Sequence, residues 1–118
     1  MILDADTIEN GACLRADVCV VGGGAAGIAL ALSLSGRGLS IILLESGRMD
    51  EDAATQALYA GEVVDERLHS PADKYRQRRL GGSTATRGGR SIPYDPIHFQ
   101  KRSQVPHSAW PISYDDQQ

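Results

Sequence analysis

Residues 17–27 read DVCVVGGGAAG, a short β-branched run that passes directly into the pattern G-x-G-x-x-G. The run at 17–21 has apolar neighbours throughout, which predicts a strand buried on both faces. Residues 25–35 are nearly all small or apolar and end at Gly-Arg-Gly, which predicts a helix buried on most sides. A second apolar run at 39–44 predicts another strand. The stretch is therefore expected to form a strand, helix, strand unit.

The lengths of these elements agree with one another. Eleven helical residues rise about 16 Å, and a five-residue strand spans about 17 Å. Such a connection is almost always a right-handed crossover between parallel strands, so the glycine turn and Glu45 should meet at the carboxyl edge of the sheet, where ligands bind. We predict an α/β fold, a Rossmann-type βαβ unit with parallel strands. It is incomplete, because two strands and one helix cannot cover both faces of a parallel sheet.

The glycine pattern has a chemical purpose at each position. Gly22 would permit the tight turn, Gly24 would let a diphosphate approach the backbone, and Gly27 would let the helix pack closely on the strand. Ala25 and Ala26 open the helix, where unpaired N–H groups and the helix dipole favour an anion. An ordinary glycine turn is the alternative, and the strand and helix around the motif argue against it.

Glu45 lies eighteen residues after Gly27, at the end of the second predicted strand. A carboxylate there can accept hydrogen bonds from both ribose hydroxyls of a dinucleotide, and it would repel a 2′-phosphate, which argues against NADP. We assign its neighbour Ser46 to the same cofactor site. The motif alone does not separate FAD from NAD.

A second glycine-rich segment follows a basic stretch. It supplies backbone donors, hydroxyl groups and arginines. The residues that supply them are Arg79, Gly81, Gly82, Ser83 and Thr84, followed by residues 88–90. It could form a second cradle for phosphate or flavin. From the residues alone, a flexible surface loop with a solvated basic face is the favoured interpretation.

Together these motifs resemble the amino-terminal part of a glucose-methanol-choline (GMC) oxidoreductase, in its bacterial choline-dehydrogenase-like branch. The resemblance rests on residues 17–27 and 43–47, on the RLGGST and GGR segments at 79–84 and 88–90, and on VPHS and WPIS at 105–108 and 110–113. It covers nearly all of residues 17–116. Arg87 lies where relatives carry other residues close to the flavin, His98 replaces a usual Asp, and Ala109 replaces a usual Gly.

The resemblance implies FAD as cofactor and oxidation of a CH-OH group of a small alcohol or sugar by hydride transfer to the flavin. Its catalytic His, with His or Asn, would lie near the carboxyl terminus of a longer chain. The present chain would then be an amino-terminal fragment, inactive alone, and a non-catalytic dinucleotide-binding remnant is the alternative. We divide it into a βαβ unit at 17–47, a helical connection at 48–79 and a glycine-rich flavin-side loop with an extended segment at 80–118.

The helical connection contains two weaker signals. Acidic residues at 50–52 precede a short apolar stretch that predicts a helix at 53–60, closed by Gly61. Ser70 as N-cap and Pro71 at the first helical position are typical of a helix start, so a basic helical turn or two is expected from there through residue 79.

Composition limits the other functions. The chain has 118 residues and a formal net charge of -3, with eleven acids and three bases in residues 1–66 and nine bases and two acids in residues 67–102. The acidic total argues against nucleic acid as a partner. With no apolar stretch of about 20 residues and no secretory signal, we expect no transmembrane segment and a cytoplasmic location.

The cysteines and histidines suggest no further chemistry. Cys13 and Cys19 have no metal-ligand spacing, and Cys19, inside the first predicted strand, is expected to be buried and reduced. His69, His98 and His107 have no partner at ligand spacing, so we expect surface or packing roles and no metal site.

Overall fold

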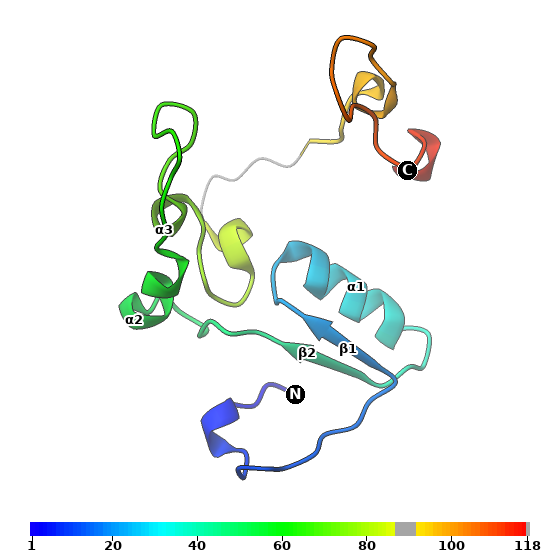
Figure 1. Cartoon of the computed structure of the whole chain (residues 1–118). Coiled ribbons are helices and arrows are strands. Elements are labelled where there is room, and N and C mark those ends of the chain that lie inside the picture. Colours follow the sequence, from blue (N-terminus) through cyan, green and yellow to red (C-terminus); the bar gives the residue numbers. More distant parts are fainter. Residues whose placement is uncertain (87–91, 118) are drawn as a thin grey trace. The chain divides into compact units, whose positions relative to one another are not determined.

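The computed structural model describes residues 1–86 and 92–117 of the chain. The chain divides into two compact units, Met1–Arg87 and Gly88–Gln118 (Figure 1). Two features of the sequence, Arg87 and the segment 88–90, lie outside the described residues.

The first unit is built on a parallel pair of strands joined by one helix (Figure 1). β1 (Val18–Val21) pairs with β2 (Ile41–Leu44) in a parallel register, with Val18 opposite Ile41. Between them in sequence, α1 (Ala25–Ser35) lies along one face of the pair. The predicted Rossmann-type βαβ unit is confirmed, and within the described residues it is incomplete because the sheet has two strands.

A reciprocal contact between Asp17 and Ser40 joins the strands at their amino ends. The Asp17 carboxylate accepts hydrogen bonds from the Ser40 hydroxyl at 2.5 Å and from the Ser40 N–H at 2.8 Å, and the Asp17 N–H donates to the Ser40 hydroxyl oxygen at 3.0 Å. The hydroxyl bond, followed by the backbone bond, lowers the pKa of the Asp17 carboxyl because both favour its charged form.

The first predicted helix of the connection is present, with its second half in 3-10 conformation. α2 (Ala53–Gln56) continues into the 3-10 helix η2 (Ala57–Tyr59), which ends two residues before the predicted stop at Gly61. Asp52 is its N-cap, and the carboxylate accepts from the Thr55 N–H at 2.8 Å. The predicted acids at this helix start therefore supply its cap.

The second predicted helix is much shorter than expected. α3 (Ala72–Tyr75) has Pro71 at its N-cap with no side-chain hydrogen bond to the cap, so the expectation that Ser70 caps it was wrong. The expectation that it runs through residue 79 was also wrong, because Arg76 is already extended at φ −114° and ψ 139°. The physical reason is a long-range one: the side chain of Gln56 binds carbonyls of this segment in place of further helical N–H groups.

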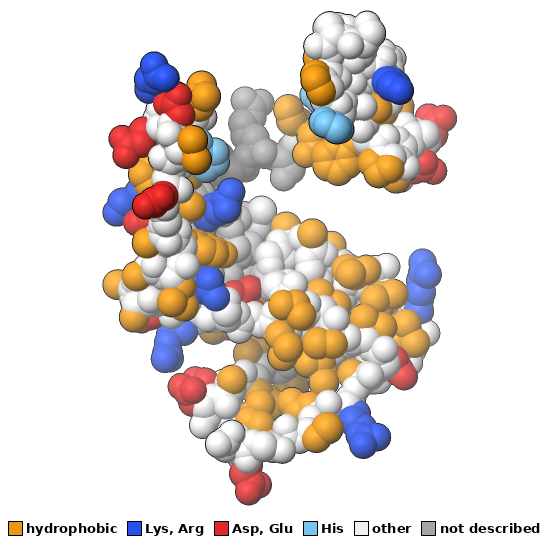
Figure 2. Space-filling view, viewed as in Figure 1, with side chains coloured by type: hydrophobic (Ala, Val, Ile, Leu, Met, Phe, Trp, Pro, Cys, Tyr) orange, Lys and Arg blue, Asp and Glu red, His pale blue; other side chains and the backbone are white. Residues whose placement is uncertain are grey.

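Burial in the first unit is lower than the sequence predicts. Among the described residues Val20 is the one buried hydrophobic side chain, with 8% of its surface exposed. Cys19, expected to be buried, is exposed, β1 is not covered on both faces, and none of the residues of α1, all of which are described, is buried. The reason is that α1 covers only one face of the strands, which leaves apolar side chains over this region in contact with solvent (Figure 2).

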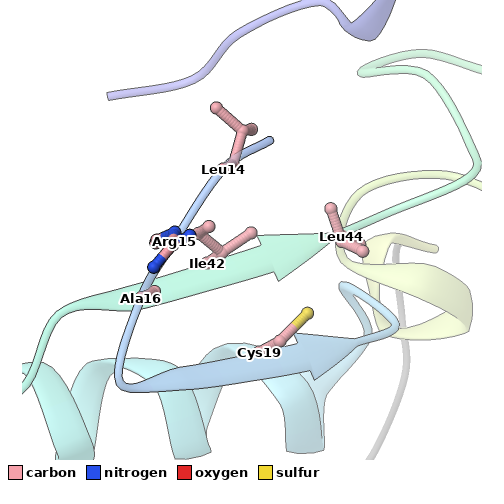
Figure 3. Close-up of a pocket in the computed structure, with 6 residues that line it drawn as sticks. All are labelled: Leu14, Arg15, Ala16, Cys19, Ile42 and Leu44. Atoms are coloured by element: carbon pink, nitrogen blue, oxygen red, sulfur yellow. The ribbon is translucent and has the colours of Figure 1, made fainter. Parts of the chain in front are cut away.

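The uncovered sheet face carries an open apolar hollow. Side chains of Cys19, Ile42 and Leu44 stand on the side of the strands away from α1, and Leu14, Arg15 and Ala16 complete the lining (Figure 3). The hollow has a volume of about 490 Å³. It lies on the face of the sheet and not at the glycine turn, so it is distinct from the edge at which the sequence predicts a cofactor.

Short 3-10 helices complete the described residues. η1 (Ala5–Thr7) and η3 (Gly82–Ala85) belong to the first unit, and η4 (Pro96–Phe99) and η5 (Asp115–Gln117) to the second.

The second unit is organised around Tyr94. Its ring centroid lies 5.4 Å from that of His98 and 5.5 Å from that of Trp110, and its backbone exchanges two hydrogen bonds of 3.2 Å with the Gln117 amide. Ala109 has φ +80°, a left-handed conformation that glycine adopts readily.

Candidate functional site: two glycine segments at the carboxyl edge of the sheet

The first glycine turn has the geometry that its three glycines predict. Gly22 has φ +104°, a conformation that residues with a Cβ rarely adopt. A Cβ on Gly27 would overlap the carbonyl oxygen of Gly22, so glycine is required for α1 to approach β1. A Cβ on Gly24, in contrast, would meet nothing within 4 Å. Gly22 is thus required by its backbone angle and Gly27 by a close contact, whereas Gly24 has neither requirement and borders open space.

The start of α1 provides donors beside that open space. Gly24 is the N-cap, and no side chain of the described residues makes a cap hydrogen bond there. Ala25, Ala26 and Gly27 form the first turn, and N–H groups in the first turn of a helix have no partner within the helix. The helix is eleven residues long, so its dipole adds to the attraction for an anion. These residues fit a diphosphate.

Glu45 links the chain segments that follow the carboxyl ends of β1 and β2. Its Oε2 accepts a hydrogen bond from the Gly23 N–H at 2.6 Å, and its Oε1 accepts one from the Gly47 N–H at 2.7 Å. The predicted meeting of the glycine turn and Glu45 at one edge of the sheet is therefore observed. Each carboxylate oxygen can accept more than one bond, so the half-buried carboxylate braces the turn and still has capacity for ribose hydroxyls. The Ser46 hydroxyl lies 3.5 Å from Oε1.

The second glycine segment packs against the first. Two isolated parallel bridges join Arg48 with Arg79 and Gly24 with Gly81. The N–H of Leu80 donates to the Arg48 carbonyl at 3.0 Å, and the N–H of Gly81 donates to the Gly23 carbonyl at 2.7 Å. Residues 79–81 thus cross the ends of both strands. The interpretation as a flexible surface loop, which the residues alone favour, does not describe this part of the segment.

Glycines also make this crossing possible. Gly81 and Gly82 have φ values of +87° and +57°, and a Cβ on Gly82 would lie 3.3 Å from the Cα of Gly24. A Cβ on Gly47 would overlap the backbone of Arg78 and Arg79. Gly47 was not predicted as a site residue, because its need for glycine comes from a segment about thirty residues further along the chain.

The polar side chains of the second segment differ in what they can offer. Arg79 donates through Nη2 to the Met49 carbonyl at 2.7 Å and lies 3.6 Å from Asp50, so its guanidinium faces the connection after β2. The Thr84 hydroxyl donates to the Gly81 carbonyl at 2.5 Å. The Ser83 hydroxyl oxygen accepts from the Gln77 N–H at 3.3 Å, and among the described residues its own proton has no acceptor.

Gln56 is a residue of this region that sequence reasoning missed. Its side-chain amide donates to the carbonyls of Asp73 at 2.7 Å and Arg76 at 2.5 Å and accepts from the N–H of Arg78 at 2.9 Å. No local pattern around residue 56 signals these bonds. Arg78, next to the crossing, places its guanidinium 5.1 Å from the ring centroid of Tyr59.

The three histidines were expected to have surface or packing roles. His69 and His107 are exposed, and His98 packs against Tyr94. Within the described ranges 1–86 and 92–117, no helix is long and apolar enough to cross a membrane.

The fold and the site define a dinucleotide-binding α/β protein: a parallel βαβ unit with a glycine turn, an uncapped helix start and a carboxylate at the end of the second strand. Residues 17–87 match the family described as FAD dependent oxidoreductase, which is more than half of the chain. The chain belongs to this family, and its cofactor is FAD. No curated protein and no solved structure matches the chain.

Proposed function

We propose that the chain is the FAD-binding portion of an oxidoreductase that acts on CH-OH groups of a small alcohol or sugar, in the manner of GMC enzymes. The family match supports an FAD-dependent oxidoreductase and extends to residue 87. The sequence resemblance to GMC enzymes continues beyond it, through residue 116. The single observation that carries the proposal is the packing of the RLGGST segment on the first glycine turn, through the bond from Gly81 to Gly23.

The residues of the edge have distinct proposed tasks toward FAD. The N–H groups at the start of α1, beside Gly24, hold the diphosphate, and Glu45 holds the adenosine ribose. Gly81 and Gly82 form a second wall of the same cradle, and Ser83 donates its free hydroxyl proton to the cofactor. Bound FAD supplies a two-electron acceptor for a hydride from the alcohol carbon.

Arg79 has a supporting task in this proposal. Its guanidinium is held by the Met49 carbonyl and lies near Asp50. It therefore keeps the crossing segment in place, and its effect on FAD is indirect. We propose no role for nucleic acid, because Arg78 and Arg79 are both engaged by other groups of the chain.

The second wall of the cradle can be tested with Gly82→Val and its control Gly61→Ala. Valine at 82 would adopt a positive φ only with strain and would press on Gly24, whereas a Cβ at 61 meets nothing within 4 Å. The FAD content of the purified proteins is the readout. Loss of FAD in Gly82→Val with full content in Gly61→Ala supports the proposal, and full content in both contradicts it.

The substrate class can be tested by anaerobic reduction of the bound flavin. The full-length oxidoreductase of which we propose this chain to be the FAD-binding portion is purified and mixed with primary alcohols and sugars and, separately, with amino acids and amines, and the flavin absorbance is followed. Bleaching by alcohols or sugars supports oxidation of CH-OH groups, whereas bleaching by amines or amino acids contradicts it. Bound FAD that no substrate reduces would favour the non-catalytic dinucleotide-binding protein.

A further inference from the structure

We infer that Gln56 is a positioning residue for FAD: its side-chain amide fixes the path of the second glycine segment onto the first. The inference rests on the proposed function of that segment as a wall of the FAD cradle. The starting observation is that one side chain makes three hydrogen bonds, all to backbone atoms of residues 73, 76 and 78.

The backbone atoms that Gln56 binds lie immediately before the crossing. Arg78 is followed by Arg79, Leu80 and Gly81, which carry the bridges and hydrogen bonds to the residues after β1 and β2. A Cβ on Gly47 would overlap the carbonyl of Arg78, so the backbone at residue 78 passes too close to residue 47 for any residue there other than glycine. A shift of the backbone at residue 78 would therefore be transmitted directly to Gly81 and Gly82.

Chain connectivity alone does not hold this segment in place. Between η2 and α3, residues 60–71 form a connection without helix or strand, in which Val64 and Leu68 are 105% and 84% exposed. α3 is only four residues long. The amide of Gln56 links the two sides of this connection directly, because it hydrogen-bonds from the end of α2 to residues that lie 17 to 22 positions later.

α2 follows β2 through the connection at residues 45–52. Asp52 caps the start of α2, and Arg79 of the second glycine segment binds the Met49 carbonyl in that connection. The positioning path thus runs from the connection after β2 through α2 and Gln56 to the second glycine segment. Removal of the amide leaves two carbonyls and one N–H without these partners, and the segment loses its register against Gly24.

Gln56→Ala tests the role, and Gln77→Ala is the matched control. Gln77 lies in the same segment, but among the described residues its side chain makes one hydrogen bond, to Glu51 at 2.9 Å. Loss of three hydrogen bonds to the backbone is expected to weaken FAD binding about tenfold or more in Gln56→Ala. Gln77→Ala is expected to stay within about twofold of the unaltered protein. FAD affinity is measured by titration of the apoprotein, with flavin fluorescence as the signal.

Gln56→Glu separates positioning from a general loss of stability. An ionised Glu can accept from Arg78 but cannot donate to the two carbonyls, whereas a protonated Glu can again donate one bond. Around this side chain the acids Glu51, Asp52 and Asp73 and the carbonyls favour the protonated form, whereas Lys74 and Arg76 favour the ionised form. FAD affinity of Gln56→Glu should therefore recover in part as the pH falls toward the ordinary Glu pKa of about 4.3, while Gln56→Ala shows no such recovery.

The outcomes distinguish this inference from the proposed function. Gln56→Ala with unaltered affinity, or Gln56→Glu without recovery at low pH, overturns the positioning role. If Gly82→Val also binds FAD normally, the second wall itself is wrong. If Gly82→Val loses FAD while Gln56→Ala retains it, the cradle stands and only the role of Gln56 fails.

Discussion

Glycine-to-alanine substitutions at three positions at the two ends of α1 have different expected effects. Gly27→Ala would place a methyl group well inside the 3.0 Å that Cβ atoms keep from other atoms, against the carbonyl oxygen of Gly22, and 3.5 Å from the Val20 side chain. A backbone carbonyl cannot rotate away as a side chain can. The overlap is relieved only if α1 moves away from β1.

The cost of that movement can be estimated. Overpacking of this kind costs about 1–3 kcal/mol, and partial exposure of Val20, the buried valine of β1 beside Gly27, costs up to about 1.5–3 kcal/mol more. The gain from replacing glycine by alanine in a helix is about 0.5–1 kcal/mol. We expect Gly27→Ala to lower the free energy of unfolding by about 3 kcal/mol, a large part of the about 5–15 kcal/mol typical of a domain.

Two matched variants isolate this effect. Gly36, at the other end of α1, has φ −61°, and a Cβ there would lie 3.5 Å from the Ser33 carbonyl oxygen, an ordinary contact. Gly36→Ala should therefore be neutral or stabilising by about 0.5–1 kcal/mol. Gly24 has φ −77°, and a Cβ there would meet nothing within 4 Å. The Gly24→Ala variant should therefore fold normally, but its methyl group would enter the space assigned to the cofactor, so the variant should lose FAD.

Urea unfolding and FAD content of the purified proteins are the two measurements. The expected pattern is loss of stability in Gly27→Ala, loss of FAD with normal stability in Gly24→Ala, and neither loss in Gly36→Ala. A Gly27→Ala variant as stable as the unaltered protein would refute the close approach of α1 to β1. Normal FAD affinity in Gly24→Ala would refute the assignment of the open space to the cofactor.

Three further predictions follow from individual contacts. Glu45→Gln keeps the shape of the side chain but loses the charge that accepts from Gly23 and, in the proposed site, from ribose, and calorimetric titration should show FAD affinity lower by about 1–3 kcal/mol. The pKa of Asp17 is lowered in the folded state by its bonds from Ser40, so its stabilising effect is present above the unfolded pKa of about 3.9 and is lost as the pH falls through the folded value. Thermal unfolding of Asp17→Asn should accordingly lack this acid-dependent step, and an unchanged step would assign it to another group. Ala109→Gly should raise the unfolding temperature, because it removes about 1 kcal/mol of strain at φ +80°.

The sequence predicts the βαβ unit nearly to the residue, because the signals for it are local. The apolar runs, the glycines at 22 and 27 and the Gly-Arg-Gly stop each act on their own neighbours. The same reasoning is wrong about Cys19 and the faces of α1, because the hydrophobic pattern indicates which surfaces tend to be covered and not what covers them.

The predictions that failed in the connection have a different cause. The basic helix ends at Tyr75, although the residues that follow are good helix formers, because the amide of Gln56 takes the carbonyls of the segment. The packing of Gly81 on Gly23 is likewise a contact across nearly sixty residues. Neither partner carries a local pattern that identifies the other, so propensity and spacing could not reveal the pair.

The three glycines of the first motif show why such a motif predicts a fold more firmly than a ligand. Gly22 is required by a backbone angle and Gly27 by the contact of α1 with β1, and both requirements hold whether or not a cofactor is bound. Gly24 has neither requirement, because its φ is −77° and a Cβ there would meet nothing within 4 Å. The same division applies across the edge: Gly47 and Gly82 make room for the crossing backbone. Four of these five glycines thus encode how the chain packs on itself, which is why spacing alone left FAD and NAD open and the family match was needed to identify FAD.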